Sequence, residues 1–264
     1  MTALSKLKYV LATVFFLVVC VLTTAYQLKV NTKLDNVQVV LNFTYAALFV
    51  CAFLFGGITT GIAGVFGICF YVLLKNQSAW LALLGLVIGL VFGIIAKLTT
   101  YLIEKKKLDK SALFISAGAF FIAIGIVFTA AVMNATDHSY YIVKNSTTFI
   151  RFYWPEYVLP YIIGVMFIVI AFIHKKLKEN LSQMLSISAF VSTSAITLYG
   201  IVCVLCSLKN KTFSLILANA YNSYFQNFII SIMVGLLIAI VLYVIGYAIV
   251  EIRLKVKNIL KDAE

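Results

Sequence analysis

Eight apolar runs, most of them about twenty residues long, follow one another along this chain of 264 residues. A helix needs about 20 apolar residues to cross the hydrocarbon of a bilayer. Lipid offers no hydrogen-bond partners to backbone N–H and C=O groups, so each run is expected to be a helix. The predicted spans are residues 8–27, 37–55, 57–75, 79–103, 111–133, 157–174, 183–208 and 227–251.

The composition agrees with this pattern. Hydrophobic residues make up 63% of the chain and charged residues only 11%, whereas a soluble domain carries about 25% charged residues. The sequence therefore predicts an all-α fold, a polytopic transmembrane helical bundle. Residues 1–252 are expected to form this single bundle, and residues 253–264 a basic amphipathic tail on the cytoplasmic side.

The distribution of basic residues predicts the orientation. If the N-terminus is cytoplasmic, thirteen of the 21 lysines and arginines fall in inner segments and seven in outer segments, with Lys97 late in the fourth span. Cytoplasmic loops of membrane proteins carry such an excess, which accounts for the net charge of +12 without nucleic acid as a partner. Both termini are expected in the cytoplasm, and the location is expected to be a cell membrane, the bacterial plasma membrane. Only Gly56 and Gly57 separate the second and third spans, so a tight turn is expected there.

Glycine is unusually frequent in the third and fourth spans. Glycine in a helix interior costs about 1 kcal/mol relative to alanine, but small residues let membrane helices approach closely. We therefore expect the helices of residues 57–75 and 79–103 to press together, with Gly89→Leu more disruptive than Gly118→Leu. Two roles of these glycines are possible: they serve helix packing alone, or they also leave a groove for a ligand beside the packed pair. The glycines at helical spacing are Gly57, Gly61 and Gly64 in one helix and Gly85, Gly89 and Gly93 in the other.

The second span begins with uncharged polar residues. Gln38, Asn42 and Tyr45 have the spacing of one helix face, near the outer end of that span. A neutral pocket of this kind beside the glycine helices would suit a small ligand that enters from outside. The alternative is hydrogen bonding between helices, worth about 0.6 kcal/mol per contact on average.

A family resemblance rests on residues 34 to 74, which read LDNVQVVLNFTYAALFVCAFLFGGITTGIAGVFGICFYVLL. An acidic residue, a helix, a Phe-Gly-Gly turn and a small-residue helix follow in order. Residues 8–104 resemble the five-transmembrane receptor region of bacterial autolysin-regulating sensor kinases, which also precedes some diguanylate cyclases. They are more loosely similar to the substrate-binding subunits of energy-coupling-factor vitamin transporters. The chain departs from the receptor pattern at Asn36 and Val37, where that region usually has arginine, and Lys75 takes the place of its terminal base.

With the acidic residue of this pattern and the polar residues of the glycine helix included, the candidate ligand-binding residues are Asp35, Gln38, Asn42, Tyr45, Thr59 and Thr60.

Reactive chemistry is not apparent in the sequence. The nine acidic residues all fall outside the centres of the predicted spans, which argues against ion-coupled transport. His138 and His174 lie at span edges, and the five cysteines lie inside apolar runs, where cysteine usually acts as a small apolar side chain. No HExxH, GxSxG or phosphate-binding loop occurs. We therefore expect no enzyme activity, no metal site and no cofactor.

These features predict an integral membrane sensor or receptor-like protein. Its bundle would respond to a small ligand or to the state of the membrane and signal to a cytoplasmic output protein or through a homodimer. The alternatives are a solute-binding membrane subunit of a transporter, of the energy-coupling-factor type, and a structural membrane interaction protein. The aromatic outer segments, residues 134–156 and 208–227, are expected at the membrane interface, as anchors or as a ligand lid.

Overall fold

Helices dominate the structure, a computed structural model that describes residues 3–26, 28–32, 37–41, 43–74, 79–105, 108–133, 139–141, 149–151, 154–208, 221 and 225–262. The elements in chain order are α1 (Ala3–Ala25), β1 (Leu28–Thr32), β2 (Val37–Leu41), α2 (Thr44–Leu74), α3 (Ala79–Lys105), α4 (Lys110–Met133), β3 (Ser139–Tyr141), β4 (Phe149–Arg151), α5 (Trp154–Ile173), the 3₁₀ turn η1 (His174–Lys176), α6 (Glu179–Ser207) and α8 (Gln226–Asp262).

The helical bundle predicted from the apolar runs is confirmed as the architecture. Within the described residues, five helices are long and apolar enough to cross a membrane, and a shorter apolar helix covers Leu54–Phe70. The five are Leu7–Ala25, Lys110–Met133, Trp154–Lys176, Glu179–Leu205 and Gln226–Ile252.

The chain reverses direction inside α2. Gly56 has φ 77° and ψ −180°, which divides α2 into helices of residues 44–55 and 57–74. A Cβ built on Gly64 would lie 3.2 Å from Leu48 Cδ2, although an unbroken helix would separate these residues by about 24 Å. The tight turn predicted between the second and third spans is therefore present.

The start of the second span is corrected by the structure. Residues 37–41 form strand β2, which pairs antiparallel with β1 in the register Leu28↔Leu41 to Thr32↔Val37. Val37, Val39 and Val40 favour a strand because β-branched side chains fit a pleated surface. The helix begins only at Thr44, and a second antiparallel pair of strands, β3 and β4, lies between α4 and α5 in the sequence.

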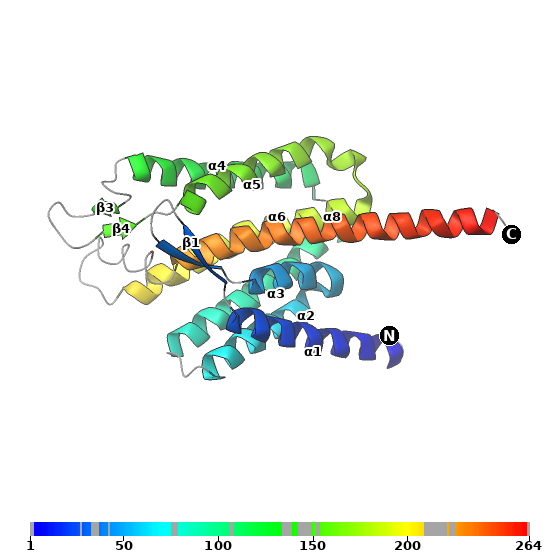
Figure 1. Ribbon diagram of the computed structural model, residues 1–264, viewed down its shortest axis with the longest axis horizontal. Helices are drawn as coiled ribbons and strands as arrows, with labels where there is room; N and C mark the ends of the chain where they lie inside the picture. Colours follow the sequence, from blue (N-terminus) through cyan, green and yellow to red (C-terminus); the bar gives the residue numbers. More distant parts are fainter. Residues whose placement is uncertain are drawn as a thin grey trace.

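Figure 1 shows the beginning of α1 and the end of α8 at one end of the bundle, with both strand pairs at the other. Contacts at the end that holds both termini agree with this view. The Ser111 hydroxyl donates to the Ala171 carbonyl oxygen over 3.4 Å, joining the start of α4 to the end of α5. Lys178 Nζ lies 3.5 Å from Glu251 Oε1, joining the start of α6 to α8. We call this the terminal end of the bundle.

The core follows the middle of the bundle. In Figure 1, α6 and α8 lie between the α4–α5 pair on one side and α1, α2 and α3 on the other. Phe49, Phe92, Phe114, Phe121 and Phe167 are among the largest fully buried side chains. The helix α8 continues unbroken from the last span into the predicted tail and ends at Asp262.

Candidate functional site

The glycine-rich helices meet backbone to backbone. A Cβ built on Gly93 would lie 2.7 Å from both the carbonyl oxygen of Gly57 and the Cα of Gly61. Further along, a Cβ on Gly64 would lie 2.9 Å from Gly89 Cα, and one on Gly89 would collide with the amide nitrogen of Val65. No larger residue fits at these three crossing points without moving a backbone. The surroundings of Gly85 lie outside what the structure describes.

A second glycine contact, which was not predicted from the sequence, joins α4 to α5. A Cβ on Gly118 would lie 2.9 Å from the carbonyl oxygen of Gly164, and a Cβ on Gly164 would lie 2.9 Å from that of Gly118. Both Gly118 and Gly89 thus meet backbone atoms within 3 Å of an added Cβ, and the expected order of the two leucine variants stays a prediction. On α4, Gly125 also faces α5, where an added Cβ would lie 3.0 Å from the Tyr161 ring, but α5 offers a single glycine, so the sequence shows no paired run of glycines here.

The predicted outer pocket does not form as a helix face. Gln38 lies in strand β2, opposite Asn31, whereas Tyr45 lies in the first turn of α2. The Tyr45 side chain is 7% exposed, and its ring centroid lies 5.3 Å from that of Phe228 and 6.3 Å from that of Phe92. Tyr45 thus packs in the core. Asp35 and Asn42 lie outside the described residues, as does the Gln38 side chain.

Thr59 and Thr60 lie far from Tyr45, beyond the Gly56 turn. The buried Thr60 hydroxyl donates to the Gly56 carbonyl oxygen over 2.9 Å and so supports the turn. Thr59 lines a cleft beside the same turn. About ten helical residues, or roughly 15 Å, separate Tyr45 from the turn. The structure therefore does not bring the described candidate residues together, and ligand binding by the predicted set stays a prediction.

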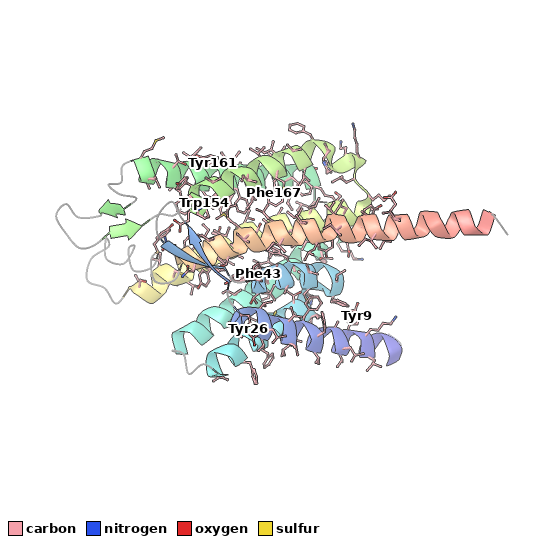
Figure 2. All side chains as sticks on the ribbon, in the orientation of Figure 1. Tyr9, Tyr26, Phe43, Trp154, Tyr161 and Phe167 are labelled. Carbon is pink, nitrogen blue, oxygen red and sulfur yellow. The ribbon has the colours of Figure 1, made fainter. Side chains whose placement is uncertain are left out.

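The cleft that includes Thr59 has a volume of about 750 Å³ and lies between α1, the Gly56 turn and the last turns of α3. Figure 2 shows Tyr9, one of its lining residues, on α1 toward the terminal end of the bundle, with Tyr26 toward the opposite end. Apolar side chains form most of the wall, and several of them are exposed on the outside of the bundle. The lining residues are Tyr9, Val10, Thr13, Val14, Phe55, Gly56, Gly57, Ile58, Thr59, Ile62, Lys97, Thr100, Tyr101, Glu104 and Lys105.

We call this space, with the lining residues just given, the terminal cleft. Charged groups line the part of it that is formed by the last turns of α3. Lys97 and Lys105 are exposed and contribute two positive charges. Glu104 accepts a hydrogen bond from Gln183 Nε2 over 3.2 Å, which ties it to α6. Among the described residues, neither lysine has an acidic side chain within ion-pair distance. The ion pair that does occur there, Lys178–Glu251, joins the start of α6 to α8. The described lining therefore carries a net positive charge.

A second, narrower groove continues from the terminal cleft along the glycine contact. Its volume is about 390 Å³, and Gly57, Ile58, Ile62 and Lys97 line both spaces. From there it extends over Gly61 and Gly93 to Val65, Phe66, Leu90 and Ile94. We call this space the glycine groove. Because glycine has no side chain, the close helix contact leaves a shallow channel on the outer surface of the pair.

Two further polar groups are buried away from the cleft. Glu156, fully buried, lies in the first turn of α5, where the positive end of the helix dipole favours a carboxylate. His174 Nδ1 lies 2.8 Å from the Ala171 carbonyl oxygen. In the described part of the chain, no group of three or more His, Cys, Asp or Glu side chains could hold a metal ion.

The fold defines a helical protein with several candidate membrane spans. No protein family, curated protein or solved structure matches this chain. The resemblance to the receptor region therefore stays a prediction, and the geometry of the bundle is the guide to function.

Proposed function

We propose that the protein is an integral membrane sensor in which the state of the terminal cleft is passed to the cytoplasm by α8. In this proposal the terminal end of the bundle faces the cytoplasm, as the positive-inside distribution of lysine and arginine predicts. Binding in the cleft favours one packing of the helices over another, because a ligand shifts an equilibrium toward the state that it binds more tightly.

The observation that carries the proposal is the continuity of α8. Its 37 residues run without a break from Gln226 to Asp262, a length of about 55 Å. The hydrocarbon of a bilayer is only about 30 Å thick. Figure 1 shows α8 extending past the terminal end of the bundle. A rigid element of this length can carry a displacement inside the bundle to a partner outside the membrane.

The two halves of α8 are held differently. In the first half, a Cβ on Gly235 would lie 2.9 Å from both the Ala46 amide nitrogen and Tyr45 Cβ, so the helix is tightly packed against α2. Further along, a groove of about 440 Å³ lies between α8, α2 and α6, lined in part by Val50, Asn180 and Tyr243. There the Tyr243 hydroxyl donates a long hydrogen bond of 3.5 Å to the Val50 carbonyl oxygen, so the second half is held less tightly than the first.

One polar link ties that second half to α6. Lys178 Nζ lies 3.5 Å from Glu251 Oε1 and 4.9 Å from the ring centroid of Tyr247. The hydroxyl of Tyr247 and, after it, the charge of Glu251 raise the pKa of the Lys178 ammonium. The lysine is 63% exposed, and exposed ion pairs contribute little to stability because solvent screens them. A link this weak can break and re-form as the bundle changes its packing.

Distance measurements between spin labels test the proposal. One label replaces Leu98 on α3 and the other Val250 on α8, both exposed, in bilayer discs that differ in lipid charge and in acyl-chain length. The reference pair replaces Ile126 on α4 and Ile162 on α5, exposed positions on the other glycine-paired helices. We expect the α3–α8 distances to change with the lipid and the α4–α5 distances to stay constant. An α3–α8 distribution that is the same in every lipid would refute the sensor.

A further inference from the structure

We infer that the terminal cleft and the glycine groove together form a binding site for one anionic phospholipid from the adjacent leaflet. Its phosphate would lie by Lys97 and Lys105, and one acyl chain would follow the glycine groove. The inference builds on the proposed function, since it names the chemical class of the ligand that the sensor binds.

The length of the combined site fits one leaflet. The lining of the two spaces runs along α3 from Leu90 to Lys105, which is fifteen residues, or about 22 Å of helix. Half of a bilayer with its headgroup region measures about 20–22 Å. The charged end covers the last turns of α3, from Lys97 to Lys105, where an interface is expected, and the apolar end points toward the bilayer centre. A phospholipid has the same order of parts over the same length.

The lining has the chemistry of an amphiphile site. The glycine groove is almost wholly apolar, with Ile58, Phe66 and Ile94 exposed at 65%, 58% and 62% beside it. At the other end, Lys97, Lys105 and the hydroxyl of Tyr101 can donate hydrogen bonds to phosphate oxygens. Glu104, the acidic residue of the lining, is already engaged by Gln183. The sequence continues with Lys106 and Lys107, so the charge of this segment favours an anion.

A second protein helix fits the site less well than a lipid. Lys97 lies eight residues, about 12 Å, inside the end of α3. A helix packed over the groove would cover this ammonium, and burial of an unpaired charge is costly. A second copy packed symmetrically on the same face would bring its own Lys97 toward the first. A phosphate neutralises the lysine instead, and a flexible acyl chain can follow the shallow channel.

The test measures binding of dimyristoyl phosphatidylglycerol and dimyristoyl phosphatidylcholine to the purified full chain by native mass spectrometry. We expect tighter binding of phosphatidylglycerol, weakened about fivefold by each of Lys97→Gln and Lys105→Gln, since a basic residue near the membrane contributes about 1 kcal/mol. The matched control is Lys175→Gln, which removes an exposed lysine from η1 outside the cleft. It should bind as the unmodified protein does. Lys97→Arg keeps the charge and should retain most of the binding.

A second pair of variants tests the acyl-chain path. Ile94→Trp adds bulk at an exposed position that lines the glycine groove, so phosphatidylglycerol should bind several-fold more weakly. Ile115→Trp adds the same bulk at an exposed position on α4 and should have no effect. Soluble glycerol 3-phosphate should not displace the lipid, because it lacks the acyl chains.

Several results would overturn the inference. They are equal binding of the two lipids, phosphatidylglycerol binding that survives both glutamine substitutions, displacement by glycerol 3-phosphate, and a dimer that excludes the lipid. The spin-label distances judge the sensor separately. If the lipid binds selectively but α8 does not move, the lipid site stands and the sensor is refuted. If α8 moves but binding shows no headgroup selectivity, the sensor stands and the lipid site is refuted.

Discussion

Gly56 is the residue on which the path of the chain depends most. Its φ of 77° and ψ of −180° lie in a region that essentially only glycine occupies. The turn lets the helix of residues 57–74 fold back on residues 44–55 and present its glycines to α3. It also forms part of the wall of the terminal cleft. One backbone conformation thus positions both the close helix contact and the candidate site.

Gly56→Ala should therefore destabilise the protein through its backbone alone. A Cβ at this position would meet no atom within 4 Å, so steric crowding by neighbours does not contribute. A residue held in such a conformation costs about 1–3 kcal/mol, and we expect that loss in the free energy of unfolding measured in mixed micelles. An alanine variant as stable as the unmodified protein would show that the turn has another conformation.

Gly89→Ala and Gly246→Ala should give different results although both replace a helical glycine. A Cβ on Gly89 would lie 2.7 Å from the carbonyl carbon of Gly64, whereas a Cβ on Gly246 would meet nothing within 4 Å. Overpacking typically costs about 1–3 kcal/mol, and an open surface position typically changes stability by less than about 0.5 kcal/mol. Thermal unfolding in one detergent compares the two, and equal melting temperatures would contradict the close contact.

At the scale of elements, small residues pair the helices. Gly89 and Gly93 join α3 to α2, Gly118 joins α4 to Gly164 of α5, and a Cβ on Gly67 would lie 2.6 Å from Cys20 Cβ of α1. Lipid is as apolar as leucine, so close van der Waals contact rather than the hydrophobic effect favours such pairs. The middle of the bundle is filled instead by large aromatic side chains such as Phe92 and Phe167.

The link between α6 and α8 should be weak and dependent on salt. In a double-mutant cycle of Lys178→Ala and Glu251→Gln, we expect a small coupling energy that falls further as salt is added. Because folding raises the pKa of Lys178, its contribution is full below the ordinary lysine pKa and is lost as the pH rises through the raised value. A large coupling energy would mean that α8 is clamped, which the sensor does not allow.

The sequence predicted the helices well because lipid restricts the alternatives. The apolar runs located the helices, the Gly56–Gly57 pair located the turn, and the repeated glycine spacing identified the α2–α3 contact. The hairpin at residues 28–41 was missed because its apolar β-branched residues read as the start of a span. The terminal cleft was missed because its lining comes from three separate segments. Lys97 and Glu104 are seven residues apart, but only the fold brings Tyr9 beside them.

At the scale of the whole molecule, signalling by α8 requires that the terminal end of the bundle faces the cytoplasm. Leu108, between α3 and α4, lies three residues beyond Lys105 of the terminal cleft, and Leu208, after α6, lies at the opposite end of that helix from Lys178. Both side chains are exposed, at 37% and 55%. The two positions therefore report on opposite ends of the bundle.

Labelling of single cysteines by a membrane-impermeant maleimide tests this orientation most directly. In a variant whose five native cysteines are replaced by alanine, Leu208→Cys should react in intact cells. Leu108→Cys should react only after the membrane is permeabilised. Labelling in the reverse order, or of both positions from the same side, would contradict the account, because α8 could not then deliver a signal to the cytoplasm.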